Sequence, residues 1–248
     1  LTDVTGVQTC ALPIYSDVCC LTIKVIPTIR VTIEKTHKTL QGHNETVSIY
    51  LDDSIDPPLE MGGFDFLIQY DPSALTFNAA VPGQLLLDCG WEYFTYRLGP
   101  AGNCGPNACP TGIVRIVAIA ETNNGEIHPG CFISPNGQLA ELSFLVTNHR
   151  TFECMYVPIR FLWYDCGDNA LSDPDGNLLY ISRHIYDYDN PIPIEADEAF
   201  PTWFGANSSC DVALEDGKPD PIRLVDFWNG GIDIICSEDI DARGDINL

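Results

Sequence analysis

The sequence predicts an all-β fold, a jelly-roll sandwich of two sheets with about nine strands and a C-terminal β-hairpin extension. Two observations favour this class. Short runs rich in β-branched and aromatic residues recur along the chain, and each run ends at Gly, Pro, Asn or Asp. No stretch of about a dozen residues shows helical periodicity with capping residues. Many short strands with frequent turns are typical of sandwiches and jelly rolls.

Residues 64–70 carry the clearest strand signal. Aromatic and aliphatic side chains occupy the even positions, while Asp65, Leu67 and Gln69 occupy the odd positions. This period of two is the pattern of a half-buried strand, and Asp71-Pro72 ends it. In chain order, the expected strands are residues 30–34, 46–51, 64–70, 75–79, 91–98, 113–121, 139–146, 157–164 and 178–182.

The chain divides into an expected leader, a sandwich and an extension. Residues 1–26 form the leader, in which residues 6–14 read as the translation of a sequencing adapter and are left out of the fold. Residues 27–189 form the sandwich, and residues 190–241 form the extension. In the extension, two apolar runs flank Asn229-Gly230-Gly231, a sequence typical of a tight type I′ turn. We therefore expect a hairpin that packs back onto the sandwich.

Composition and motifs exclude several classes of function. Thirty-five acidic residues against 12 basic residues give a net charge of −23, which disfavours nucleic acid and anionic lipid as partners. No stretch approaches the roughly 20 apolar residues of a membrane span. The motifs of serine hydrolases, zinc peptidases and nucleotide-binding enzymes are missing, which favours a protein that is not an enzyme. A glycosidase needs only two carboxylates across a cleft, so that enzyme class stays an open alternative.

Cysteine usage indicates an extracellular protein, secreted or at the cell surface. The chain has 11 cysteines, and leaving out Cys10 of the adapter-like segment gives an even number, as paired cysteines require. Cys154 and Cys166 are not expected to pair, because one straight strand would hold them roughly 40 Å apart. The expected disulfides are Cys104 with Cys109, Cys89 with Cys131, and Cys210 with Cys236.

The string GGFDFLIQYDPSAL at residues 62–75 resembles the third strand and following turn of cohesin domains. Residues 81–86 are similar to the next loop of that family, residues 137–146 to its seventh strand, and residues 173–177 to its last turn. The resemblance covers about residues 29–189. It implies a non-catalytic module that binds another extracellular protein, such as a dockerin, on a bacterial surface or in a polysaccharide-degrading complex.

Two alternatives to a protein-binding module stay open. Carbohydrate-binding modules share the jelly-roll architecture, which makes a polysaccharide the alternative partner. Such a module needs coplanar exposed aromatic residues along one sheet, and the candidates are Trp91, Tyr93, Tyr156 and Tyr164. The second alternative is an accessory or catalytic domain of a glycoside hydrolase.

The resemblance also implies a binding face. Cohesin-like modules present one flat sheet, made of strands three, five, six and eight, to their partner. The expected outward residues on these strands are Asp65, Leu67, Gln69, Tyr93, Arg115, Val117, Ile119, Arg160, Leu162 and Tyr164. Apolar and aromatic groups ringed by polar groups are typical of an interface. In the alternative interpretation, the C-terminal hairpin covers this sheet and the same residues are core.

Calcium is the one candidate cofactor. The oxygen-bearing side chains of Asp173, Asp175 and Asn177 alternate as ligands of a calcium loop do, although the same residues are typical of a plain Asp-Gly turn. Residues 242–248 resemble the opening of a type I dockerin, in which Asp245 and Asn247 would be the first and third ligands. The remaining ligands are missing from the sequence, so we expect no calcium at this second position.

Overall fold

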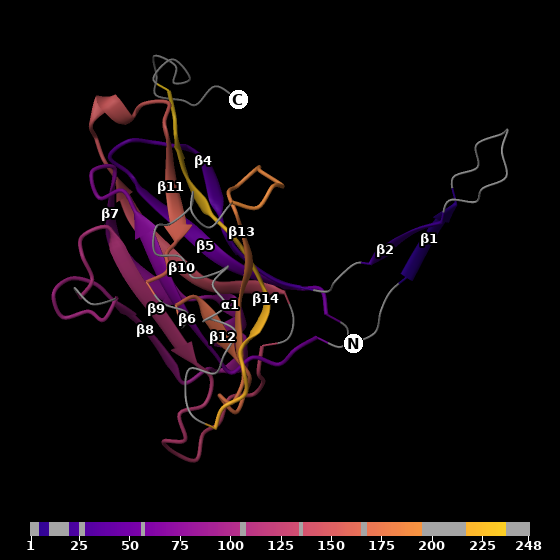
Figure 1. Cartoon of the computed structure of the whole chain (residues 1–248). Coiled ribbons are helices and arrows are strands. Elements are labelled where there is room, and N and C mark those ends of the chain that lie inside the picture. The colour runs from indigo at the N-terminus through magenta and orange to yellow at the C-terminus, as the bar shows by residue number, and fades with distance from the viewer. Residues whose placement is uncertain are drawn as a thin grey trace, which may run out of the picture.

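The computed structural model describes residues 5–9, 20–24, 28–55, 58–104, 108–133, 136–164, 168–194 and 217–236. In these ranges the chain is an all-β sandwich with one short helix, α1 (Gln84–Cys89), and one 3₁₀ turn at Arg150–Phe152 (Figure 1). This confirms the predicted fold class. Across the same ranges, no helix combines the length and the apolar character needed to cross a membrane.

Each of the expected strands is present, with shifted ends. The strands are β1 (Thr5–Thr9), β2 (Cys20–Lys24), β3 (Ile29–Ile33), β4 (Lys35–Thr39), β5 (Asn44–Asp53), β6 (Gly63–Tyr70), β7 (Leu75–Pro82), β8 (Tyr93–Arg97), β9 (Ile113–Ile119), β10 (Gly137–Val146), β11 (Tyr156–Phe161), β12 (Ala170–Ser172), β13 (Leu179–Tyr186), β14 (Ile222–Trp228) and β15 (Gly230–Ile234).

Two layers of strands form the sandwich. The order β8-β9-β6-β11-β15-β4 makes one layer, and β13-β14-β3-β5-β10-β7 makes the other. The layers join into one hydrogen-bonded sheet through β12, which pairs with β6 of the first layer and with β13 of the second. Strands β1 and β2 pair only with each other and lie apart from the sandwich (Figure 1).

Aromatic side chains fill the space between the layers. On β6, Phe66 points inward, as its even position predicts, and its ring lies 5.8 Å from that of Phe161 on β11 and 6.3 Å from that of Phe227 on β14. Trp163 adds a fourth ring, 5.4 Å from that of Phe227. Each pair meets edge to face, a geometry that stabilises by about 1 kcal/mol beyond burial. This core holds β6 at the centre of its layer.

The predicted C-terminal hairpin is wrong. Strand β14 pairs in parallel with β13 and β3, whereas β15 pairs with β11 and β4, so the two runs are successive strands of opposite layers. Asn229 lies at the crossing, where its backbone N–H donates to the carbonyl of Tyr186 and its side chain accepts from the N–H of Phe161. A Cβ on Gly230 would lie 2.2 Å from the carbonyl oxygen of Ile33. Glycine is therefore required here because two strands approach closely. The local sequence pattern is the same as that of a hairpin turn, so the sequence alone does not separate the two cases.

A second buried asparagine supplies backbone hydrogen bonds that are missing beside β6. Opposite β6, the ladder of β11 ends at Phe161, and the chain rejoins β6 as β12 at Ala170. In the gap, the side-chain amide of Asn169 accepts from the N–H of Leu67 at 2.9 Å and donates to the carbonyl of Leu162 at 2.6 Å. The amide thus replaces a missing peptide group, as complete pairing of buried backbone groups requires.

Three disulfides staple the described residues. Cys89 bonds to Cys131 and Cys104 bonds to Cys109, the two pairs named from the sequence. Cys236 bonds to Cys154 and not to Cys210. The difference follows from the topology. Strand β15 runs antiparallel beside β11, so Cys236, two residues after β15 ends, lies next to Cys154, two residues before β11 begins. Cys166 and Cys210 lie outside the described residues.

Candidate partner-binding face

The solvent-facing side of β8, β9 and β6 carries a small apolar patch. Tyr93 on β8 lies directly opposite Ile119 on β9, and Val117 on β9 lies opposite Asp65 on β6. Tyr93 is 36% exposed and Ile119 is 40% exposed, while Val117, two residues before Ile119 on β9, is half-buried. Opposed residues of antiparallel strands lie about 5 Å apart, and alternate residues of one strand share a face, so the three apolar side chains form one patch. We call Tyr93, Val117 and Ile119 the apolar patch.

A shallow groove of about 230 Å³ continues the patch toward β12. Val117 and Ile119 form one wall, and Ala170 of β12 with Leu179 of β13 form the other. Neither Ala170 nor Leu179 is among the residues expected from the sequence. The signal that could have revealed them is the pair of short apolar runs around the turn at Asp175-Gly176, which is the local pattern of a hairpin.

Arg115 at the centre of the face is held in place by neighbours. Its Nε lies 2.8 and 3.0 Å from the two carboxylate oxygens of Asp65, and its Nη1 donates to the carbonyl of Asn103 at 2.7 Å. Asp168 lies 3.5 Å from Nη2. This fork fixes the planar guanidinium and balances the charge of Asp65. Arg115 and Asp65 therefore serve as a rigid polar border of the apolar patch.

Leu67 and Leu162 do not belong to the exposed face, in contrast to the prediction. Leu67 is 0% exposed, and both side chains belong to the main hydrophobic core. The cause is the early end of β11, because the backbone N–H of Leu162 donates to the carbonyl of Leu67 while Asn169 holds the N–H of Leu67. The chain after Phe161 therefore lies against β6 and does not extend an open sheet.

The far side of the expected face is polar. Gln69 is exposed and lies opposite Arg160, which is half-buried and 3.8 Å from the carboxylate of Asp187. Tyr164 is half-buried, and its backbone N–H donates to Asp168. Strand β15 pairs with the first residues of β11, edge to edge within the same layer, so it does not cover this face. The alternative of a covering hairpin is thus wrong.

The four aromatic candidates for a polysaccharide platform do not come together. Trp91 packs against the core, with its ring 6.2 Å from that of Phe64. Tyr156 lies on β11, three strands from Tyr93 on β8 and toward the opposite end of the layer. Its ring contacts the ammonium of Lys35 at 4.8 Å, and burial, followed by the charge of Asp187, raises the pKa of its phenol. The rings thus belong to different local environments.

The expected calcium loop forms a turn between β12 and β13. Asp173 accepts from the backbone N–H groups of Asn177 at 2.7 Å and Leu178 at 3.0 Å. The ammonium of Lys218 contacts Asn177 Oδ1 at 3.2 Å and the carbonyl of Gly176 at 3.1 Å, while Asp175 is exposed. A bound ammonium beside these oxygens favours the plain Asp-Gly turn. Asp245 and Asn247 lie outside the described residues.

The fold and the face together define an all-β sandwich that presents a partly apolar sheet to solvent. No family model matches the chain, and no curated protein matches its sequence.

Solved structures of similar shape include cohesin modules. The sixth cohesin of scaffoldin B from Acetivibrio cellulolyticus, solved in complex with a Cel5 dockerin, shares 12% identity over 84% of this chain and 99% of its own, with a TM-score of 0.49. A cohesin of OlpA from Clostridium thermocellum, in complex with a type I dockerin, shares 17% identity over the same fractions with a TM-score of 0.48. The cohesin module of a family 33 glycoside hydrolase from Clostridium perfringens shares 11% identity over 61% of this chain and 88% of its own, with a TM-score of 0.40. These values are too low to carry a functional conclusion.

Proposed function

We propose that this chain is a non-catalytic, cohesin-like module that binds another extracellular protein through the outward face of β8, β9 and β6. The observation that carries the proposal is the apolar patch of Tyr93, Val117 and Ile119, bordered by the fixed Arg115–Asp65 pair. A central apolar cluster with a polar border is the anatomy of protein interfaces. The cohesin-like string at residues 62–75 supplies β6, the strand that the resemblance assigns to the binding sheet.

The absence of catalysis is part of the proposal. The space between the two layers is filled by packed aromatic and aliphatic side chains, which is the condition of a binding module and not of an enzyme with a deep substrate channel. On the face itself, the carboxylate of Asp65 is held in an ion pair by Arg115, which gives it a structural role.

An extracellular location is supported by the cysteines. Three disulfides close segments of very different lengths, and stable disulfides form in oxidising compartments. The net charge of −23 keeps such a module soluble at high local concentration and disfavours acidic partners.

A binding panel tests the proposal. The oxidised protein is immobilised and exposed to purified type I dockerins and, in parallel, to soluble polysaccharides. The proposal expects at least one dockerin to bind with a dissociation constant of about 1 μM or lower, and no polysaccharide to bind. Retention of a polysaccharide with no dockerin bound would instead support the carbohydrate-binding alternative and would contradict the proposal.

A further inference from the structure

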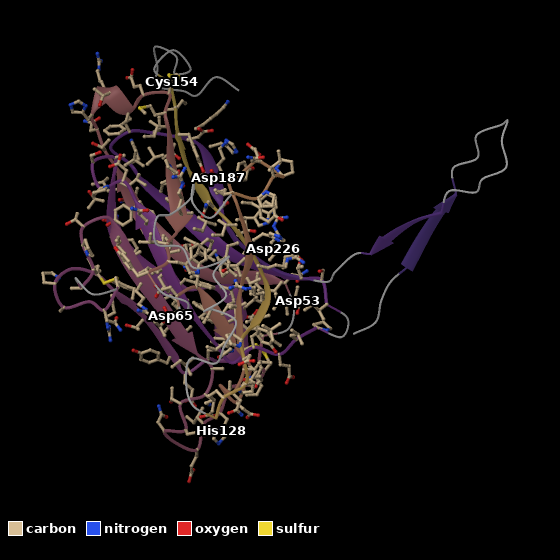
Figure 2. The ribbon with its side chains drawn as sticks, in the orientation of Figure 1. Asp53, Asp65, His128, Cys154, Asp187 and Asp226 are labelled. Carbon is tan, nitrogen blue, oxygen red and sulfur yellow. A yellow bond between two sulfur atoms is a disulfide. The ribbon has the colours of Figure 1, made fainter. Side chains whose placement is uncertain are left out.

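A cluster of metal-binding side chains lies beyond the ends of β8 and β9. Glu92 precedes β8, Glu121 follows β9, and His128 lies in the segment after β9. One potential ligand atom from each of the three side chains lies within 4.8 Å of the other two. His128 marks the end of the sandwich opposite Cys154 (Figure 2). The cluster is separate from the groove and from the apolar patch.

The close approach of two carboxylates is the unusual feature of this cluster. The side chains of Glu92 and Glu121 are near enough to interact directly, although both are acidic. Two carboxylates at this range repel unless they share a proton or a cation. A divalent cation held between the two carboxylates and the imidazole of His128 would relieve this repulsion.

The surrounding chain holds each donor in place. Glu92 Oε2 accepts from the N–H of Thr122 at 2.8 Å, which leaves its second oxygen for a ligand. Glu121 Oε1 accepts from the N–H of Asn123 at 2.7 Å, and Glu121 Oε2 contacts Nδ1 of His128. Contacts of this kind fix the direction of metal ligands.

A disulfide links the two chain segments that carry the donors. Cys89 lies three residues before Glu92, and its partner Cys131 lies three residues after His128. The N–H of Gly130 also donates to the carbonyl of Cys89 at 2.7 Å. The covalent bond therefore keeps His128 beside the two carboxylates, so little ordering of the chain is needed when an ion binds.

We propose that Glu92, Glu121 and His128 bind a divalent transition-metal ion of the zinc class. Three donors of the nitrogen and oxygen type suit zinc, whose usual four ligands would be completed by water. His128 is exposed, which gives the ion and that water a path from solvent. Calcium prefers six to eight oxygen ligands and does not favour imidazole, so the donor set discriminates against it.

The site adjoins the apolar patch in sequence. Glu92 immediately precedes Tyr93, and Glu121 follows Ile119 by two residues. A bound ion would therefore fix the ends of both strands that carry the patch. Metal binding itself does not depend on the proposed partner, so the two proposals can fail separately.

Isothermal titration of zinc chloride and of calcium chloride into the oxidised protein tests the proposal. The protein is first treated with a chelator, and free thiols are alkylated because they bind zinc themselves. The proposal expects about one zinc site per chain and no calcium site. The variants Glu121→Gln and His128→Gln should each weaken zinc binding by about 10-fold or more.

The matched control is His37→Gln. His37 pairs with a single carboxylate, that of Asp233, at 3.0 Å on another part of the surface, so its loss should leave zinc binding unchanged. Melting curves of all variants without metal establish that each is folded. Zinc binding that is absent from the parent protein, or equal in the parent and in both site variants, would overturn the proposal. So would a calcium site of comparable affinity that the same substitutions remove.

Discussion

Replacement of Asn169 by alanine should destabilise the protein strongly, because the buried amide pairs with two backbone groups beside β6. Asn169 is 0% exposed, and its amide satisfies the N–H of Leu67 and the carbonyl of Leu162. An unsatisfied buried backbone group costs about 1–3 kcal/mol, so the two groups together cost about 2–6 kcal/mol. Asn169 also has a φ of +56°, and alanine in this left-handed region adds a penalty of about 1 kcal/mol.

A glycine variant separates the two contributions. Asn169→Gly loses the same hydrogen bonds but tolerates the positive φ, so it should be about 1 kcal/mol more stable than Asn169→Ala. Urea unfolding, followed by the fluorescence of tryptophan residues that include the buried Trp163, gives both free energies of unfolding. Asn78→Ala is the control, because its amide contacts Asn44 at an exposed position and its loss should cost less than about 0.5 kcal/mol. An Asn169→Ala variant as stable as this control would refute the role of the amide in the sheet.

Three further predictions concern stability. Leu67→Asp should lower the melting temperature by several degrees without any partner present, because it buries an unpaired carboxylate; an unchanged melting temperature would return Leu67 to the exposed face. The pKa of Tyr156 is raised in the folded state, so its contribution to stability is full below about pH 10 and declines as the pH rises further. Tyr156→Phe should therefore lose less stability than the parent between about pH 9 and pH 11, and parallel melting curves would contradict this. The double variant Cys154→Ser, Cys236→Ser opens a connection with a sequence separation of 82 and should lose roughly 4 kcal/mol of unfolding free energy in urea, whereas a loss below about 1 kcal/mol would show that the bond constrains little.

Strand positions were predictable because their signal is local. The alternation at residues 64–70 assigns Phe66 and Ile68 to the core, and the structure buries both completely. The period of two in a strand depends only on neighbouring residues, so one sequence suffices to detect it. The same parity failed for Leu67, whose burial is set by a segment about a hundred residues later in the chain.

Features produced by distant contacts were not predictable from local patterns. Asn229-Gly230-Gly231 has the composition of a tight turn, yet Gly230 is required by its approach to the carbonyls of Ile33 and Glu34. Likewise, Cys236 pairs with Cys154 because β15 and β11 are neighbours in the sheet, which the sequence does not state.

The candidate site was predicted in part. Tyr93, Val117 and Ile119 lie together on one face, as the strand parity implies, and the binding of a partner by this face stays a prediction. The groove wall formed by Ala170 and Leu179 was not predicted, because β12 has only three residues and is too short to show the alternating pattern of a strand. The metal-binding cluster was missed for another reason. Glu92 lies far from Glu121 and His128 in the sequence, and the three residues lack the short spacing by which ligand motifs are recognised.

The central claim is that the apolar patch binds a protein partner, and a matched pair of variants tests it most directly. Ile119 on the proposed face is 40% exposed, and Leu145, on β10 in the opposite layer, is 39% exposed. Isothermal titration with the tightest-binding dockerin of the panel measures the affinity of Ile119→Asp, Leu145→Asp and the parent protein. The account predicts that Ile119→Asp weakens binding by about 2 kcal/mol or more, about 30-fold, while Leu145→Asp binds as the parent does and all three proteins melt at similar temperatures. Equal binding by the two variants, or loss of binding only in Leu145→Asp, would contradict the account.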